Sequence, residues 1–259
     1  VKQSSMRHFS NKSSLLSIPT TTSTEKDIQV LAKHTKKVMK QVFGIAKMRH
    51  LQPKAVECFL RRKSQIVVMA TGGGKSLCYQ LPAVALGGTT VVVSPLIALM
   101  IDQVKALLEK GIPAAAISSS NTERENTEVI ERILGRSVKT SKSKRKASSD
   151  DAPAPPSPMT IVYCTPEQLQ TERFRSVLKE LDSKNRLTGF AIDEAHCLSS
   201  WGHDFRPAYR RLGILREQFP RVPCIACTAT ATPKVLADIQ TTLHLADAPL
   251  HIGSFDRSN

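Results

Sequence analysis

QIVVMATGGGKS, residues Gln65 to Ser76, joins a short apolar run to three consecutive glycines that are followed by lysine and serine. The β-branched apolar part predicts a buried strand. Glycine tolerates the tight backbone that points several N–H groups at one anion. A helix that begins near Lys75 adds the positive end of its dipole. The stretch therefore predicts a core strand that runs into a phosphate-binding loop.

In such a loop the Lys75 ammonium reaches the β- and γ-phosphates, and the Ser76 hydroxyl ligates Mg²⁺. The strict pattern G-x-x-x-x-G-K-[ST] is not met, because Met69 occupies its first position. A flexible glycine turn is the alternative, but the strand before the glycines and the Lys-Ser pair after them favour the phosphate loop. We expect a nucleotide to be bound by Thr71, Gly72, Gly73, Gly74, Lys75 and Ser76.

A second apolar run, Leu187 to Ile192, ends in two adjacent acids. A carboxylate at this position, Asp193, is placed to hold Mg²⁺. The next one, Glu194, is placed to orient and deprotonate a water molecule. Adjacent acids alone are usually a solvated surface pair, and His196 alone is more often a structural histidine. After a core strand, in a chain with a phosphate loop, we predict that all three are catalytic, together with Lys75, and that His196 is a relay.

Several segments together resemble the first RecA-like lobe of RecQ-family DNA helicases, over residues 43–259 apart from one interruption. They are FGIAKMRHLQ (43–52), the phosphate loop, VVVSPLIALMIDQV (91–104), YCTPEQL (163–169), IDEAH (192–196), SSWGHDFRP (199–207), CTATAT (227–232) and SFDRSN (254–259). The resemblance implies an α/β fold, a RecA-like P-loop NTPase lobe whose mainly parallel sheet carries helices on both faces. Short apolar strands that alternate with helical patterns agree with that fold.

The resemblance also assigns roles outside the phosphate loop. Arg49 and Gln52 stand at the adenine-reading positions, and an amide suits both the donor and the acceptor of that base edge. The alternative is that Arg49 and Gln52 are ordinary residues at a helix start, because Pro53 follows Gln52 and proline is favoured at the first position of a helix. The residues expected to contact DNA, or to couple it to hydrolysis, are Ser94, Thr165, Trp201, His203, Asp204, Phe205, Arg206, Thr228 and Thr230.

The loop around Trp201, the only tryptophan, combines aromatic and basic residues without helical or strand periodicity. Exposed aromatic rings beside arginine suit stacking on single-stranded bases. The alternative is a small hydrophobic cluster beneath a loop. Strand-end threonines such as Thr228 are common, so they indicate little alone.

The chain organises into three parts. Residues 1–26 are rich in Ser, Thr and Lys, and we expect them to be disordered. Residues 27–259 form the lobe, beginning with a helix over residues 28–42. Residues 135–158, rich in Ser, Lys and Pro, form a flexible insertion. We expect strands near 65–70, 90–94, 114–117, 160–163, 188–193 and 224–228, and helices at 96–110 and 233–243.

The net charge of +15 favours a polyanionic partner. Much of the excess positive charge lies in residues 1–40 and 136–158, outside the motifs, so the support for a polyanionic partner is modest.

Six cysteines spread over predicted strands and helices indicate buried thiols in a reducing compartment. Cys224 and Cys227 have metal-like spacing, but in a strand they face opposite sides. No run reaches a membrane span.

We therefore expect an ATP-dependent DNA helicase lobe that uses ATP and Mg²⁺ and binds single-stranded DNA and duplex junctions. The resemblance implies 3′-to-5′ unwinding and roles in DNA repair and recombination, in the nucleus of a eukaryote or otherwise the cytoplasm. The chain begins at Val1 and lacks a second lobe, so we expect a fragment with slow turnover. The alternatives are a DEAD/DEAH-type RNA helicase and a truncated, non-catalytic nucleic-acid-binding module.

Overall fold

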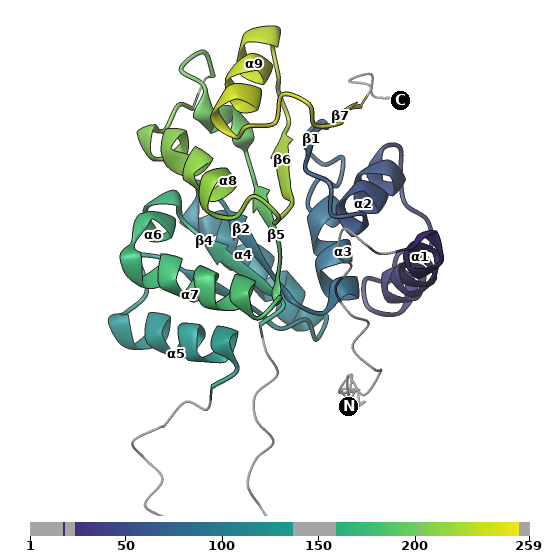
Figure 1. The fold of residues 1–259 in the computed structure, drawn as a ribbon, viewed down its shortest axis with the longest axis horizontal. Coiled ribbons are helices and arrows are strands. Elements are labelled where there is room, and N and C mark those ends of the chain that lie inside the picture. The colour runs from purple at the N-terminus through teal and green to yellow at the C-terminus, as the bar shows by residue number, and fades with distance from the viewer. Residues whose placement is uncertain (1–17, 19–23, 137–158, 203, 254–259) are drawn as a thin grey trace, which may run out of the picture.

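A computed structural model of the chain describes residues 18, 24–136, 159–202 and 204–253. Within these residues, seven strands form one sheet in the order β3-β4-β2-β5-β6-β1-β7, and all neighbouring pairs are parallel (Figure 1). Their bounds are β1 Gln65–Val68, β2 Thr89–Val93, β3 Ala114–Ile117, β4 Ile161–Cys164, β5 Leu187–Ile192, β6 Cys224–Thr228 and β7 Leu250–Ile252.

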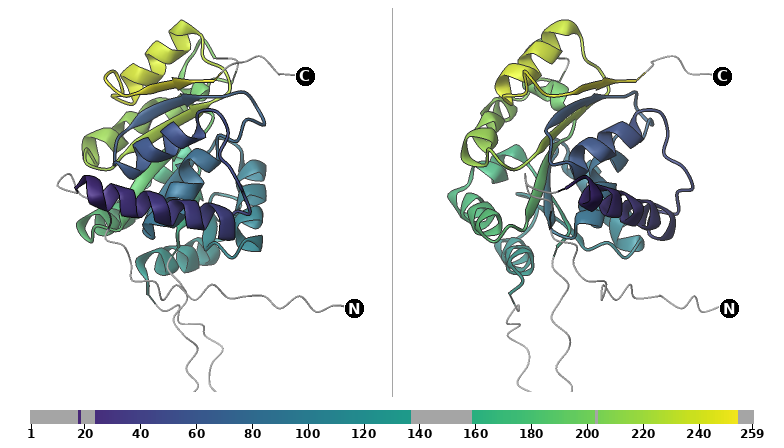
Figure 2. Two further views of the ribbon diagram at one scale, coloured as in Figure 1. Left: turned by 90° about the vertical axis from the view of Figure 1, so that its right-hand side faces the viewer. Right: turned by 45° about the vertical axis from the view of Figure 1, so that its right-hand side comes forward.

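Helices cover both faces of the sheet, as the right-hand view of Figure 2 shows. One face carries α1 Glu25–Gln41, α2 Gln52–Leu60, α3 Leu77–Leu86 and α4 Ile97–Glu109. The other carries α5 Glu123–Leu134, α6 Pro166–Gln170, α7 Glu172–Ser183, α8 Ile214–Gln218, α9 Pro233–Thr242 and the 3₁₀ helices η1 Ala195–Leu198 and η2 Pro207–Gly213. This is the predicted α/β architecture.

Strands β1 to β6 each contribute to two cores, because successive side chains point to opposite faces. In β2, Val91 and Val93 pack on the face with α5 and α7, while Val92 packs on the face with α3. Cys224 and Cys227 are divided between the two faces in the same way, as predicted. Strands buried on both sides read as continuous apolar runs, which is why the sequence reveals them.

The N-terminal boundary and one packing residue need correction. Thr24 and Asp27 form a reciprocal capping box, so α1 begins at Glu25 and the residues from Thr24 onward are ordered rather than disordered. A packed helix over residues 28–42 predicts that its apolar residues Val30, Leu31, Val38 and Val42 face the core. Leu31 and Val38 are buried, as are Ile28 and Met39, whereas Val30 is 52% exposed.

The insertion begins later than predicted. Gly135 ends α5 with φ +73°, and Arg136 pairs with Glu180 at 2.8 Å. Both residues therefore belong to the packed lobe. The rest of the predicted insertion, and the motif at 254–259, lie outside the described residues.

The six predicted strands are all present, and their bounds agree to within two residues. The short edge strand β7 was not predicted, because Leu250 and Ile252 are both substantially exposed and the strand has no buried apolar run. None of the helices in the described ranges is long and apolar enough to cross a membrane.

Candidate functional site

The predicted site residues converge at the carboxyl ends of three neighbouring strands. The phosphate loop follows β1, the acidic pair follows β5, and Thr228 ends β6. Because the sheet order is β5-β6-β1, these three ends lie side by side, although they come from distant parts of the sequence. In parallel α/β sheets, this edge is where ligands bind.

The phosphate loop takes the backbone shape that its glycines permit. Gly72 and Gly74 have φ values of +79° and +83°, which other residues rarely adopt. A Cβ at Gly73 would lie 2.9 Å from the carbonyl oxygen of Ala70. The Lys75 ammonium donates to the Met69 carbonyl at 3.1 Å, folded across the loop. The loop is thus a tight cradle with its lysine inside, and α3 begins directly after Ser76.

Gln52 is bound to this loop in a way that the sequence did not indicate. Its side chain is buried and donates to the Gly74 carbonyl at 3.1 Å, while its oxygen accepts from the Arg49 backbone N–H at 2.8 Å. Arg49 itself is exposed. The amide is more than an ordinary helix-start residue, since it links α2 to the phosphate loop. Adenine recognition by these two residues stays a prediction.

Asp193 is a buried carboxylate, only 6% exposed. Burial first, and then the neighbouring charge of Glu194, raises the pKa of Asp193 to about 6, while Lys75 acts in the opposite direction. The Tyr209 hydroxyl donates to the Asp193 backbone carbonyl at 3.1 Å, a support that no sequence pattern revealed. A desolvated carboxylate opposite the loop lysine is suited to receive a cation.

His196 joins the acidic strand end to β6. Its Nδ1 lies 3.2 Å from the Glu194 carboxylate and 3.1 Å from the Thr228 hydroxyl. That hydroxyl donates to the carbonyl of Thr230 at 2.8 Å. The chain of contacts runs from the predicted base to the end of the next strand, which is the geometry that a relay requires.

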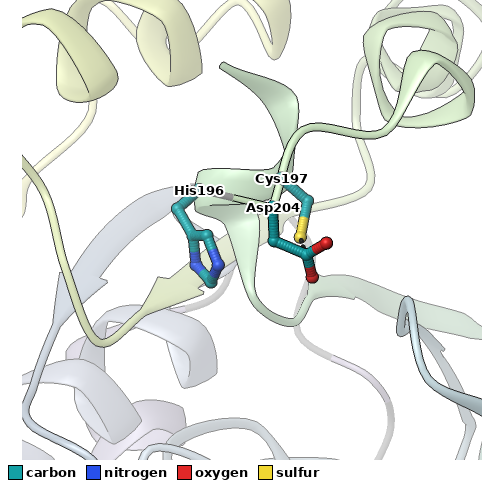
Figure 3. A group of neighbouring side chains, drawn as sticks. All are labelled: His196, Cys197 and Asp204. Atoms are coloured by element: carbon teal, nitrogen blue, oxygen red, sulfur yellow. Dashed lines mark hydrogen bonds between the residues drawn. The ribbon is translucent and has the colours of Figure 1, made fainter. Parts of the chain in front are cut away.

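His196, Cys197 and Asp204 also bring potential metal ligands within 4.8 Å of one another (Figure 3). Burial raises the pKa of the Cys197 thiol to about 12, and its sulfur donates to Asp204 at 3.7 Å. Thiolate is the form that binds metals, and His196 already contacts Glu194 and Thr228. We interpret the group as packing between η1 and the loop that follows.

The aromatic loop, residues 199–206, presents its rings to solvent. Trp201 is 66% exposed, which excludes the alternative of a buried cluster beneath the loop. The Lys234 ammonium lies 4.1 Å from the centroid of the Trp201 ring. Phe205 is partly exposed, with the Arg210 guanidinium 5.0 Å from its ring centroid. His203 lies outside the described residues.

Other predicted DNA-contacting side chains point inward. Arg206 donates to the Pro95 carbonyl at 2.8 Å, so it holds the loop against the segment after β2. Ser94 is buried. Thr165 is buried as well and accepts the Gln168 N–H at the start of α6. Contact of these three residues with DNA stays a prediction. The Thr165 hydroxyl and the Arg206 guanidinium have structural roles here.

Two polar residues that the sequence did not single out anchor the aromatic loop. The Ser199 hydroxyl donates to Asp238 on α9 at 2.5 Å and accepts the Trp201 backbone N–H at 3.1 Å. Asp238 lies 39 residues beyond Ser199, and nothing in its local pattern marks this contact.

Comparison with known proteins agrees with this geometry. A family model described as DEAD/DEAH box helicase matches residues 49–239. The chain is 42% identical to ATP-dependent DNA helicase Q-like 2 of Arabidopsis thaliana and 40% identical to ATP-dependent DNA helicase RecQ of Pasteurella multocida. These alignments cover 84% and 86% of this chain but 28% and 31% of the relatives, so the chain spans about a third of their length. The expected resemblance to RecQ-type helicases is confirmed.

The fold also resembles the crystal structure of the DUF1998 helicase MrfA. The TM-score is 0.60 at 18% identity, over 85% of this chain and 32% of that one. At this identity the likeness concerns the fold alone. It agrees with the predicted RecA-like lobe.

Proposed function

The chain belongs to the DEAD/DEAH box helicase family, and from this we propose that it is the ATP-binding lobe of a RecQ-type, ATP-dependent DNA helicase. The observation that supports this most is the line of contacts from Glu194 through His196 to Thr228. These contacts join the acidic strand end to the segment that leads to α9. Helix α9 in turn contacts the aromatic loop through Asp238 and Ser199.

The residues at the nucleotide side fit Mg²⁺-ATP. The Gly73 cradle leaves no room for a Cβ, and the buried Asp193 faces a lysine. Ser76 and Asp193 would hold Mg²⁺, Lys75 would bind the phosphates, and Arg49 and Gln52 would select adenine. When bound, Mg²⁺-ATP supplies the phosphoanhydride bond and the cation that neutralises its charge. Glu194 orients a water molecule and accepts its proton.

The aromatic loop is the proposed contact with single-stranded DNA. Exposed rings beside basic side chains bind bases without sequence preference, because every base has a π-face. Trp201 and Phe205 offer such rings. Asp204 and Arg206 hold the loop close to η1 and to Pro95, so movement of the loop is transmitted to the acidic strand end.

The proposal extends from this lobe to the complete enzyme. We propose that a second RecA-like lobe completes the cleft with an arginine, and that the complete enzyme moves 3′-to-5′ and unwinds duplex junctions. Buried free thiols suit a reducing compartment, and the basic residues between Lys142 and Lys146 suit nuclear import, so we propose the nucleus if the source is eukaryotic and the cytoplasm otherwise. Roles in repair and recombination are proposed from the resemblance to RecQ-family helicases alone.

The test is ATP turnover and nucleotide binding by this chain and by Lys75→Ala, with no nucleic acid, with single-stranded DNA and with RNA of the same sequence. We expect detectable ATP binding by the wild type, lost in Lys75→Ala, and slow turnover that DNA changes little. In a protein carrying both lobes, we expect DNA-stimulated turnover that Lys75→Ala abolishes. Lys179→Ala on the exposed surface of α7 is the control.

Normal turnover in Lys75→Ala would contradict the nucleotide site. Stimulation of the two-lobe protein by RNA and not DNA would favour an RNA helicase. DNA binding by the intact chain without detectable ATP binding would favour the truncated, non-catalytic nucleic-acid-binding module.

A further inference from the structure

Lys234, which no sequence motif marks, covers the ring that is proposed to receive a base. Its ammonium lies 4.1 Å from the centroid of Trp201, well within the range of a cation–π contact. Both residues are exposed, and they belong to different elements, α9 and the aromatic loop. A nucleobase that stacks on this face of Trp201 has to displace the ammonium.

The position of the Trp201 backbone is fixed relative to Lys234 by a second contact. Asp238, one helical turn after Lys234 on α9, accepts from Ser199, whose hydroxyl accepts the Trp201 N–H. Helix α9 therefore holds the loop through Asp238 and covers its ring through Lys234. The anchor at Ser199 is fully buried, whereas the ring is open to solvent.

The second exposed ring of the loop is covered in the same manner. The Arg210 guanidinium lies 5.0 Å from the Phe205 centroid and also donates to Ser200 at 3.3 Å. Two exposed aromatic faces thus carry cations rather than apolar side chains. A cation on a ring is a ready partner for the phosphate that accompanies an arriving base.

We propose that Lys234 is a positioning residue for single-stranded DNA, which covers Trp201 in the free lobe and is exchanged for a base. After the exchange its ammonium pairs with the adjacent backbone phosphate. This inference rests on the proposed DNA-binding function of the aromatic loop. It deepens that function by assigning a residue and an order of events.

The relative strengths of the contacts favour the exchange. An exposed cation–π contact changes an equilibrium constant by about 2- to 5-fold. Stacking of a base on an aromatic ring changes it by about 5- to 150-fold. The base therefore replaces the ammonium, and the displaced lysine gains a phosphate contact.

Placement beside the strand end gives the exchange a route to the catalytic acids. Helix α9 begins after Thr232, which caps it through the N–H of Val235. The preceding Thr230 and Thr228 contact each other, and Thr228 contacts His196. Lys234 therefore lies within one helical turn of residues 228–232, the segment that contacts His196. Its release from the ring can be transmitted through that segment.

The test measures binding of an oligothymidylate by the intact chain, followed by the fluorescence of Trp201, the only tryptophan. The variants are Lys234→Ala and Lys234→Arg, with Lys179→Ala as the charge-matched control. Loss of one phosphate contact should make the slope of log K against log salt about 0.7 shallower in Lys234→Ala. The affinity deficit of that variant should then shrink about fourfold between roughly 50 and 400 mM salt.

The fluorescence separates exchange from a simple phosphate contact. The free Lys234→Ala and wild-type proteins should differ in emission, because the ammonium lies on the ring only in the wild type. Their DNA-saturated spectra should coincide, because a base has replaced the ammonium. Lys234→Arg should retain the wild-type slope, and Lys179→Ala should leave the free emission unchanged.

An unchanged salt slope in Lys234→Ala, with normal DNA binding, would overturn this inference and leave the proposed function intact. So would saturated spectra that still differ as the free ones do. Failure of the wild-type chain to bind the oligonucleotide would overturn the proposed DNA contact and the inference together.

Discussion

Asp193 carries a charge in a place that disfavours it. Its pKa is raised from 3.8 to about 6, chiefly by burial. Between these pH values the folded chain binds a proton that the unfolded chain does not, so this group lowers stability as pH rises through the window. The difference corresponds to about 3 kcal/mol when fully developed above pH 6. A cation bound at the carboxylate relieves this cost.

Substitution of Asp193 by Asn should therefore stabilise the chain in EDTA and without nucleotide. We expect Asp193→Asn to raise the melting temperature at about pH 7.5, and the gain to shrink as the pH falls towards about 3, below both pKa values, where the wild-type carboxyl is mostly protonated in both states. Thermal unfolding at a series of pH values measures this. Asp102→Asn, on the exposed side of α4, should show no such trend. A destabilised Asp193→Asn at about pH 7.5 would contradict the account.

Individual residues of the site were predictable when their chemistry follows from type and local spacing. Lys75 after glycines and Asp193 after an apolar strand are such residues. Asp238, Lys234 and Tyr209 were not predictable. Their contacts join residues far apart in sequence, and an aspartate or lysine on a helix surface is usually solvated.

The end of β6 contacts the helix that follows the acidic strand end and continues into the segment before α9, so we expect it to couple hydrolysis to the aromatic loop. Its last residue, Thr228, is fully buried, and its hydroxyl contacts both His196 and Thr230. Removal of that hydroxyl leaves the shape of the strand in place but breaks the contact between the two segments.

Thr228→Val, in a protein with both lobes, should retain ATP binding and lose stimulation by single-stranded DNA by about tenfold or more, an interaction energy within the usual range for coupling between sites. Steady-state turnover with and without DNA measures it. Thr188→Val is the matched control, because Thr188 is an equally buried strand threonine whose hydroxyl contacts Thr90 instead. Equal losses of stimulation in the two variants would show that destabilisation alone is responsible.

The strands were predicted more accurately than any other element. Continuous apolar runs such as Ile161–Cys164 are unmistakable when both faces of the sheet are covered. Strand β7 was not predicted because it lies at the sheet edge. Its pairing with β1 defines it as a strand, and its sequence has no buried apolar run. The start of α1 was placed slightly late because the capping box at Thr24 was not considered.

At the scale of the whole molecule, the cysteine thiols are poorly placed to react with reagents in solvent. All six cysteines are free and buried. Burial raises the pKa of Cys58 to about 11 and those of Cys78 and Cys224 to about 12. Because the thiolate is the reactive form, these thiols are protected by both access and ionisation.

Modification by a thiol-reactive disulfide reagent should therefore follow global unfolding. In the native chain near pH 7.5 we expect slow reaction, and in denaturing urea we expect all six thiols to react. A nucleotide that binds the folded chain should slow the native reaction further. Rapid reaction of one or more thiols in the native chain would contradict this prediction.

The meeting of the three strand ends could not be predicted from spacing alone. Phosphate loop, acidic pair and Thr228 are separated by long stretches of chain, and only the strand order brings them together. The family resemblance implied that the phosphate loop and the acidic pair share one nucleotide site, whereas the alternation of strands and helices implied only a parallel sheet.

The same strand order has a consequence for synthesis on the ribosome. Strand β1 pairs only with β6 and β7 among the described strands. It therefore cannot join the sheet until the chain from Cys224 onward has been synthesised. At about 5–20 residues per second, synthesis of the intervening chain takes roughly 8 to 30 seconds. Throughout it, an apolar strand and its glycine loop are without a sheet, open to chaperones or to neighbouring nascent chains. We therefore expect the edge that carries the candidate site to be among the last parts of the lobe to form.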